Sequence, residues 1–173
     1  MEFLKIVAFS VGAAIAYGIV HDQVTAHLCV EYFTVAHPPV FPTQSPFWLA
    51  IGWGIIATWW VGLPLGIILA LVARAGPWPP LSLNDVRPLI FQLLITMALT
   101  ALVAGIIGAV LAATGKLQLP QELAPLIPPA KHAAFMADAW AHLASYASGT
   151  LGGLIVIGYA LWRRLAGRIP IVG

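Results

Sequence analysis

Long apolar runs, separated by short polar or proline-rich stretches, fill the chain from end to end. Several of them approach or exceed the ~20 residues that an α-helix needs to cross ~30 Å of hydrocarbon. This pattern predicts an all-α, polytopic membrane protein with four transmembrane helices in a bundle. We expect a single membrane domain over 1–173, with helices at about 3–34, 46–73, 85–113 and 131–165.

Prolines and capping residues mark the ends of these helices. The proline cluster "HPPVFPTQSP" at 37–46 cannot continue a helix, so the first helix has to end before it. Ser82 or Asn84 is the expected N-cap of the third helix, and Gly115 is expected to end it. Pro64 predicts a kink in the second helix.

Composition supports the membrane class. The chain is 61% apolar and 8% charged, with a mean hydropathy of +0.94, which is too apolar for a soluble domain of this size. The net charge is +2 and no basic cluster is dense enough for nucleic acid. Cys29 is the only cysteine, so no intrachain disulfide can form. The first apolar run has some features of a signal peptide, but we interpret it as the first membrane helix.

Lysine and arginine residues in the short flanking segments predict the orientation. One side of the membrane collects six of them and the other side two. We therefore expect both termini in the cytoplasm, with the 35–46 and 114–131 loops on the outer side. The six are Lys5, Arg74, Arg87, Arg163, Arg164 and Arg168, and the two are Lys116 and Lys131.

Two predicted helices carry a histidine and a carboxylate four residues apart, which places each pair on one helix face. The pairs are His27 with Glu31 and Asp138 with His142. At 1.5 Å per residue from the flanking cationic residue, both histidines lie roughly 32 Å, and both carboxylates roughly 38 Å, from the inner boundary. The matched depths predict that these four side chains lie together near the outer membrane face.

Two imidazoles and two carboxylates can complete a zinc shell, or most of an iron or manganese shell. Helical bundles build metal sites from such positions on facing helices. The sequence thus predicts a divalent metal site, with zinc as first choice. Two alternatives stay open: a structural clasp between the first and fourth helices, and a proton or ion path.

A second group of residues can support this site or add a ligand to it. Asp22 points about 140° away from His27 around the helix, so it either supports the site or joins a separate hydrogen-bond network. The full group is His21, Asp22, Gln23, His132 and Tyr146.

Three functions fit this pattern. The first is a metal-binding protein, with a metal-dependent hydrolase of a lipid or small substrate as its extension. The second is a non-catalytic accessory or assembly subunit of a larger membrane complex, or a homo-oligomer. The third is a b-type haem protein, ligated by His27 and His142.

The stretch "HDQVTAHLCVEYFTVAHPP", followed by "LAIGWGIIATWWVGLPLG", resembles a family of small, uncharacterised bacterial four-helix membrane proteins. The resemblance covers roughly residues 17–74. It implies no activity, because none is established for that family, and it implies a multi-pass protein of the bacterial inner membrane with the site toward the periplasm.

Overall fold

A computed structural model describes residues 1–167, and that part of the chain contains helices and loops but no strand. Arg168, counted above among the cytoplasmic cations, lies outside the described residues, as does the rest of the domain to residue 173. The helices are α1 (Glu2–Leu28), α2 (Val30–Val35), α3 (Pro46–Ile56), α4 (Trp59–Arg74), α5 (Leu83–Ala113) and α6 (His132–Ala166), with 3₁₀ turns η1 (Ala124–Leu126) and η2 (Pro129–Lys131).

Four helical segments are long and apolar enough to cross a membrane. They contain 27, 29, 31 and 38 residues, and the second combines α3 with α4. A span needs about 20 residues, so each has length to spare. The segments are Glu2–Leu28, Pro46–Arg74, Leu83–Ala113 and Pro129–Ala166. The protein is therefore all-helical and membrane-like in the part of the chain that the structure describes.

The segment predicted as one helix over 3–34 is two helices. Cys29 interrupts it with an extended backbone, at φ −147° and ψ 89°. The amide of Cys29 still donates to the Thr25 carbonyl, and helix resumes with Val30. This break removes the regular rotation that the sequence argument assumed between His27 and Glu31.

The second segment is interrupted at Ala57 and Thr58, ahead of Pro64, which lies inside α4. Close contact with α1 occurs at this level. A Cβ atom added at Gly54 would lie 2.5 Å from the amide nitrogen of Ile19, and one at Gly18 would lie 2.6 Å from the Gly54 carbonyl oxygen. Glycine is required at both positions, because any side chain would force the two backbones apart.

The predicted cap of α5 is present. Ser82 and Asp85 form a capping box, in which the Asp85 carboxylate accepts from the Ser82 amide at 2.8 Å. Gly115 follows the helix with φ +72°, the conformation that favours glycine after a helix end.

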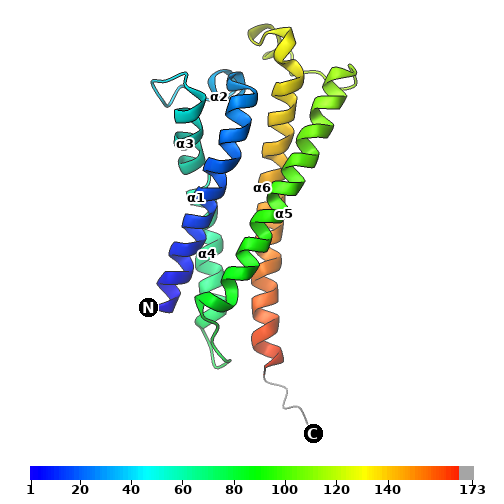
Figure 1. Cartoon of the computed structure of the whole chain (residues 1–173). Helices are drawn as coiled ribbons and strands as arrows, with labels where there is room; N and C mark the ends of the chain where they lie inside the picture. The colour runs from blue at the N-terminus through cyan, green and yellow to red at the C-terminus, as the bar shows by residue number, and fades with distance from the viewer. Residues whose placement is uncertain (168–173) are drawn as a thin grey trace.

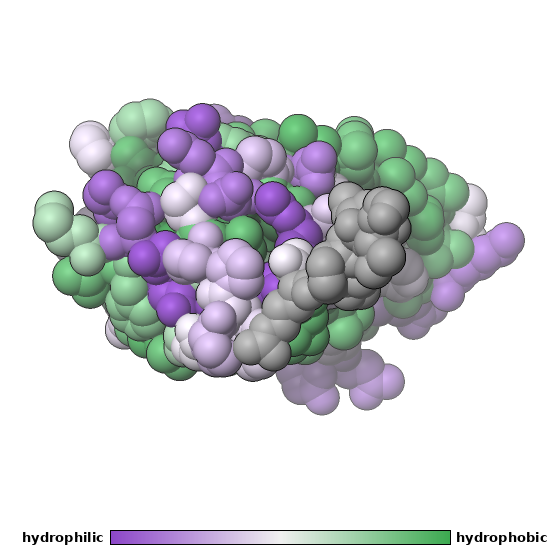
Figure 2. Space-filling model, turned by 90° about the horizontal axis from the view of Figure 1, so that it is seen from below, coloured by the Kyte–Doolittle hydropathy of each residue, from purple (hydrophilic) through white to green (hydrophobic). Residues whose placement is uncertain are grey.

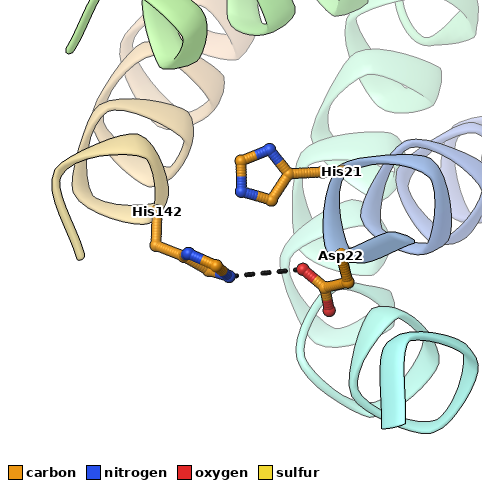
Figure 3. Close-up of side chains that lie close together, drawn as sticks. All are labelled: His21, Asp22 and His142. Atoms are coloured by element: carbon orange, nitrogen blue, oxygen red, sulfur yellow. Dashed lines mark hydrogen bonds and ion pairs between the residues drawn. The ribbon is translucent and has the colours of Figure 1, made fainter. Parts of the chain in front are cut away.

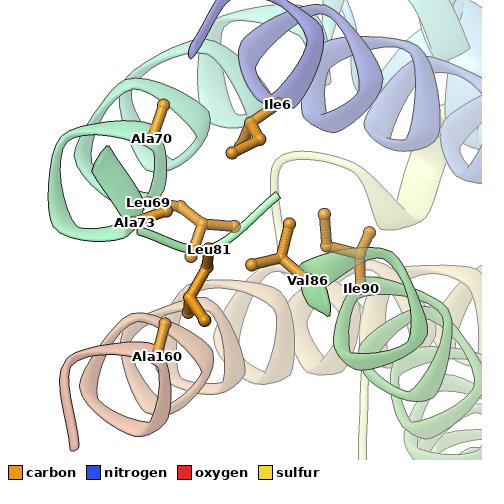
Figure 4. Packing of buried hydrophobic residues seen from close by; sticks show 8 residues of the cluster. All are labelled: Ile6, Leu69, Ala70, Ala73, Leu81, Val86, Ile90 and Ala160. Carbon is orange, nitrogen blue, oxygen red and sulfur yellow. The ribbon is translucent and has the colours of Figure 1, made fainter. Parts of the chain in front are cut away.

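The helices pack in two sets that run side by side (Figure 1). Helix α1 packs along α3 and α4, α5 packs along α6, and α4 also contacts α6. The N-terminal end of α1 and the Ala166 end of α6 lie at the same end of the molecule (Figure 1). A buried apolar cluster near this end joins α1, α4, α5 and α6, as Figure 4 shows for Ile6, Leu69, Ala70, Ala73, Leu81, Val86, Ile90 and Ala160.

Arg164 adds a polar link at the same end. Its guanidinium is 1% exposed and donates to four backbone carbonyls at the end of α4 and in the following loop. Those acceptors belong to Val72, Ala75, Trp78 and Pro79.

The outer surface is apolar along the helices. Leu99, Leu102, Leu151 and Ile155 are all exposed. Seen from the end that carries the N-terminus, hydrophilic residues gather toward the viewer and hydrophobic residues line the flanks (Figure 2). Such a belt is what a lipid environment requires of the sides of a helical membrane protein.

Candidate metal site

Three potential metal ligands meet between α1 and α6. Each of His21, Asp22 and His142 offers one ligand atom, and these atoms all lie within 4.8 Å of one another. Nε2 of His142 lies 3.3 Å from Oδ1 of Asp22 (Figure 3). The rings of His21 and His142 meet edge to face, with centroids 4.6 Å apart. Two imidazoles and a carboxylate from two facing helices form a compact donor set.

The tautomer of His142 follows from the hydrogen bond of its second ring nitrogen. Nδ1 lies 2.8 Å from the backbone carbonyl oxygen of Asp138, one turn earlier in α6. A carbonyl can only accept, so Nδ1 is the donor and Nε2 of a neutral imidazole is an acceptor. Nε2 and the Asp22 carboxylate are then two acceptors in contact. Either an added proton or a metal ion has to lie between them.

The ligand side chains are held by packing. Asp22 is 5% exposed. The Tyr32 ring covers the His142 imidazole at 4.6 Å and Phe33 meets its edge at 5.7 Å. Tyr17 stacks on His21 at 5.7 Å. Aromatic neighbours on both histidines restrict ring rotation, which is the preorganisation that a metal site needs.

A cavity of about 100 Å³ borders the three groups. Its wall includes several hydroxyl and imidazole groups, and the volume is several times the ~30 Å³ that one water occupies. Tyr17 and Ser145 hydroxyls are 2.8 Å apart, and the Tyr146 hydroxyl donates to the Ala57 carbonyl at 3.2 Å. The polar residues in its lining are Tyr17, His21, Asp22, Tyr32, His37, Thr58, His142, Ser145 and Tyr146.

Of the four predicted ligands, the structure places only His142 in this group. His27 is exposed, and its Nδ1 donates to the Gln23 carbonyl at 2.7 Å. Gln23 in turn donates its side-chain amide to the Phe47 carbonyl at 3.2 Å. The side chains of His27 and Gln23 therefore have hydrogen-bond partners outside the His21, Asp22 and His142 cluster.

The two predicted carboxylates also have other surroundings. Glu31, beyond the break, accepts a hydrogen bond from the Cys29 thiol at 3.3 Å. Asp138 is fully buried and positions His142 through its backbone carbonyl, while neither of its carboxylate oxygens has a hydrogen-bond partner.

The remaining supporting residues divide between the site and the loops. His21, Asp22 and Tyr146 line the cavity, and the first two supply ligand atoms. His132 lies at the start of α6 and its Nε2 donates to the Ile127 carbonyl at 3.0 Å.

Helix register explains why His142 meets Asp22 instead of His27. The predicted register placed His142 level with His27, whereas its 3.3 Å contact is with Asp22, five residues earlier in α1. Five residues rise about 7.5 Å along a helix. Asp22 and His27 also point about 140° apart, so one α6 side chain cannot face both. The cost of an unpaired Asp22 in the apolar interior was the available signal for this pairing.

Burial controls the ionisation of two residues beside the site, beyond the end of α1. Burial, followed by the hydrogen bond to Glu31, raises the pKa of the Cys29 thiol from 9.0 to about 12. Burial also raises the pKa of the Tyr32 phenol. Both groups are therefore neutral near pH 7, and neither offers an anionic ligand without losing a proton.

Comparison of the chain with protein-family models, with curated proteins and with solved structures found no match. The class that its own features define is an all-helical protein with four segments able to span a membrane and a His/Asp group between two of them.

Proposed function

We propose that this chain is an integral membrane protein that binds a divalent metal ion through His21, Asp22 and His142, with zinc as first choice and iron or manganese next. Of these three residues, His142 was predicted from the sequence as a ligand, and His21 and Asp22 were predicted as supporting residues or extra ligands. The observation that carries it is the contact between two acceptors, Nε2 of His142 and Oδ1 of Asp22, at 3.3 Å.

The donor set suits these metals. Zinc binds imidazole nitrogen and carboxylate oxygen at about 2.0–2.2 Å, so two of its ligand atoms lie at most about 4.4 Å apart. The observed spread, within 4.8 Å, requires only a small side-chain adjustment. The bond from Nδ1 of His142 to a backbone carbonyl is the usual second contact of a metal-binding histidine, since it fixes the tautomer.

A zinc ion held by His21, Asp22 and His142 would supply a water nucleophile near neutral pH. On that basis we extend the proposal to a metal-dependent hydrolase of a lipid or small substrate. The bordering cavity and its tyrosine and serine hydroxyls can bind and orient a polar group beside the ligands.

A haem is a poorer fit to this geometry. The cavity of about 100 Å³ is well below the roughly 300–1,000 Å³ of sites for cofactors and small molecules. The His21 and His142 rings, with centroids 4.6 Å apart, leave no space for a porphyrin between them.

A structural clasp is the second candidate, in an accessory or assembly subunit of a larger membrane complex or in a homo-oligomer. The same 3.3 Å contact supports it, because one proton shared by His142 and Asp22 also satisfies both acceptors. The two candidates differ in a measurable quantity, the metal content.

The proposed setting is the bacterial inner membrane. Both termini would lie in the cytoplasm, and the ligands would lie in the periplasmic half of the helices. The excess of cationic residues at the end that carries the N-terminus supports this orientation.

Elemental analysis of protein purified without a polyhistidine tag or chelator tests the metal. We expect about one zinc, iron or manganese per chain, lost in His142→Ala and in His21→Ala. His27→Ala is the matched control, an exposed histidine on the same helix as His21, and it should retain the metal. Metal-free wild type, or equal metal loss in all three variants, would reject the metal site and favour the clasp.

A further inference from the structure

A second, larger cavity lies between α1 and α5, with α6 as its floor. Its volume is about 410 Å³, within the range of sites that bind small organic molecules. Alanine and glycine residues of α5 and α6, among them Ala98, Gly105 and Ala141, keep it open. Tyr17 and His21 border both this groove and the smaller cavity of the metal site.

The length of the groove matches one leaflet. Its lining extends along α1 from Tyr17 to Leu28 and along α5 from Ala98 to Ala109. Each stretch rises about 16 Å at 1.5 Å per residue, roughly half of the ~30 Å hydrocarbon core. Val24 and Leu102 on its rim are 68% and 60% exposed, so the groove is continuous with the apolar outer surface. A single lipid chain can enter it sideways.

Asp138 gives the groove a polar end. It lines the groove, its side chain is 0% exposed, and neither carboxylate oxygen has a hydrogen-bond partner. A buried carboxyl group without a hydrogen-bond partner is unfavourable in either protonation state, so a donor from a ligand would stabilise it. Asp138 lies one turn before His142 in α6, nearer to the N-terminal end of that helix.

A cation stands at the same end. Nζ of Lys131 lies 3.5 Å from the carbonyl oxygen of Leu28, the last groove residue on α1. A buried carboxyl group on the groove wall and a cation at its mouth complement a head group that carries an amine and a phosphate. The chain below the head group would extend toward Tyr17, in the middle of the membrane.

We propose that this groove is a binding site for one aminophospholipid, whose ammonium donates to Asp138, whose phosphate contacts Lys131 and whose acyl chain fills the channel between α1 and α5. The site does not depend on the proposed metal, since none of its head-group contacts is a metal ligand. His21 borders both cavities, so a bound lipid would lie next to the metal site.

Native mass spectrometry of the delipidated, detergent-solubilised chain tests the site, with chelator present to remove any metal. The probes are dioleoyl phosphatidylethanolamine, phosphatidylcholine and phosphatidylglycerol at equal concentration. The first has an ammonium with N–H donors, the second a cation without them, and the third no amine. We expect one phosphatidylethanolamine per chain to be retained in preference to the other two.

Asp138→Asn should lower that preference at least about tenfold, as expected for loss of one charge-assisted hydrogen bond. Glu122→Gln removes an exposed loop carboxylate and should leave the preference unchanged. Equal retention of the three lipids by wild type, or an unchanged preference in Asp138→Asn, would overturn the proposal.

A steric pair of variants tests the groove without touching the carboxylate. Ala98→Phe places a ring in the part of the groove where the acyl chain would lie, and it should reduce retention of all three lipids. Val103→Phe places the same ring on the exposed face of α5 and should have no effect. If both variants retain lipid as wild type does, the lipid binds elsewhere and the assignment of this groove is wrong.

Discussion

Cys29 lies where α1 ends, and it combines complete burial with a hydrogen bond from its thiol to Glu31. The structure shows that its extended backbone ends α1 and that its side chain holds the carboxylate that the sequence had assigned to a metal. At the scale of one residue, a local interaction can thus remove a predicted ligand.

Cys29 should react slowly with alkylating reagents in the folded protein. Its pKa is raised to about 12, so at pH 8 the reactive thiolate fraction is roughly a hundredfold or more below that of a free cysteine. The rate of iodoacetamide labelling in native membranes, compared with the rate in SDS, measures this. Glu122→Cys combined with Cys29→Ser provides an exposed reference thiol. Equal Cys29 rates in membranes and in SDS would contradict the prediction.

Among helices, the polar link between α6 and α4 is the feature that the sequence least suggested. Arg163 and Arg164 are adjacent and were counted together as cytoplasmic flanking charges. In the structure Arg164 is buried against the carbonyls at the end of α4, whereas the Arg163 side chain is 37% exposed and lies 3.7 Å from an Asp85 carboxylate oxygen.

Arg164→Met should therefore destabilise the protein by about 2–4 kcal/mol, because several buried carbonyls lose their donor. Arg163→Met should cost less than about 1 kcal/mol, as expected for a partly exposed ion pair. The shift in the unfolding midpoint in detergent, followed by circular dichroism, compares the two variants. A similar shift for both would mean that the buried hydrogen bonds of Arg164 do not stabilise α6 against α4.

For the whole molecule, the helix ends and the charges lead to one expectation about topology. The start of α1 and the end of α6 lie at the same end of the molecule, where hydrophilic residues gather (Figures 1 and 2). Most of the lysine and arginine residues of the chain belong to the segments at that end.

Reporter fusions in a bacterial host test the proposed orientation. A green fluorescent protein at the C-terminus should fluoresce, because it folds in the cytoplasm. Alkaline phosphatase inserted after Glu122, in the 114–131 loop, should be active, because it requires the periplasm. A dark C-terminal fusion together with an inactive loop fusion would contradict the proposed orientation. The opposite orientation would place the proposed metal site on the cytoplasmic side.

The sequence by itself determined the class of the molecule. Four apolar helical segments follow from length and hydropathy, and their outer limits follow from prolines and caps such as the Ser82–Asp85 box, because these signals are local. The predicted involvement of His142 rested on its spacing from Asp138 and on its depth counted from Arg163, and that of Asp22 on the cost of burying an unpaired aspartate in a membrane.

Only the tertiary structure decided which of these groups meet. Partner choice depends on helix register, on rotation and on the break at Cys29, and an error of one turn moves a side chain by about 5.4 Å. Spacing along one helix gives relative positions within that helix but not the offset between two helices. That offset depends on contacts between helices, such as Gly18 against Gly54 and the hydrogen bonds of Arg164 to the carbonyls after α4. For that reason His142 faces Asp22 and His21, whereas Asp138 lines the groove between α1 and α5.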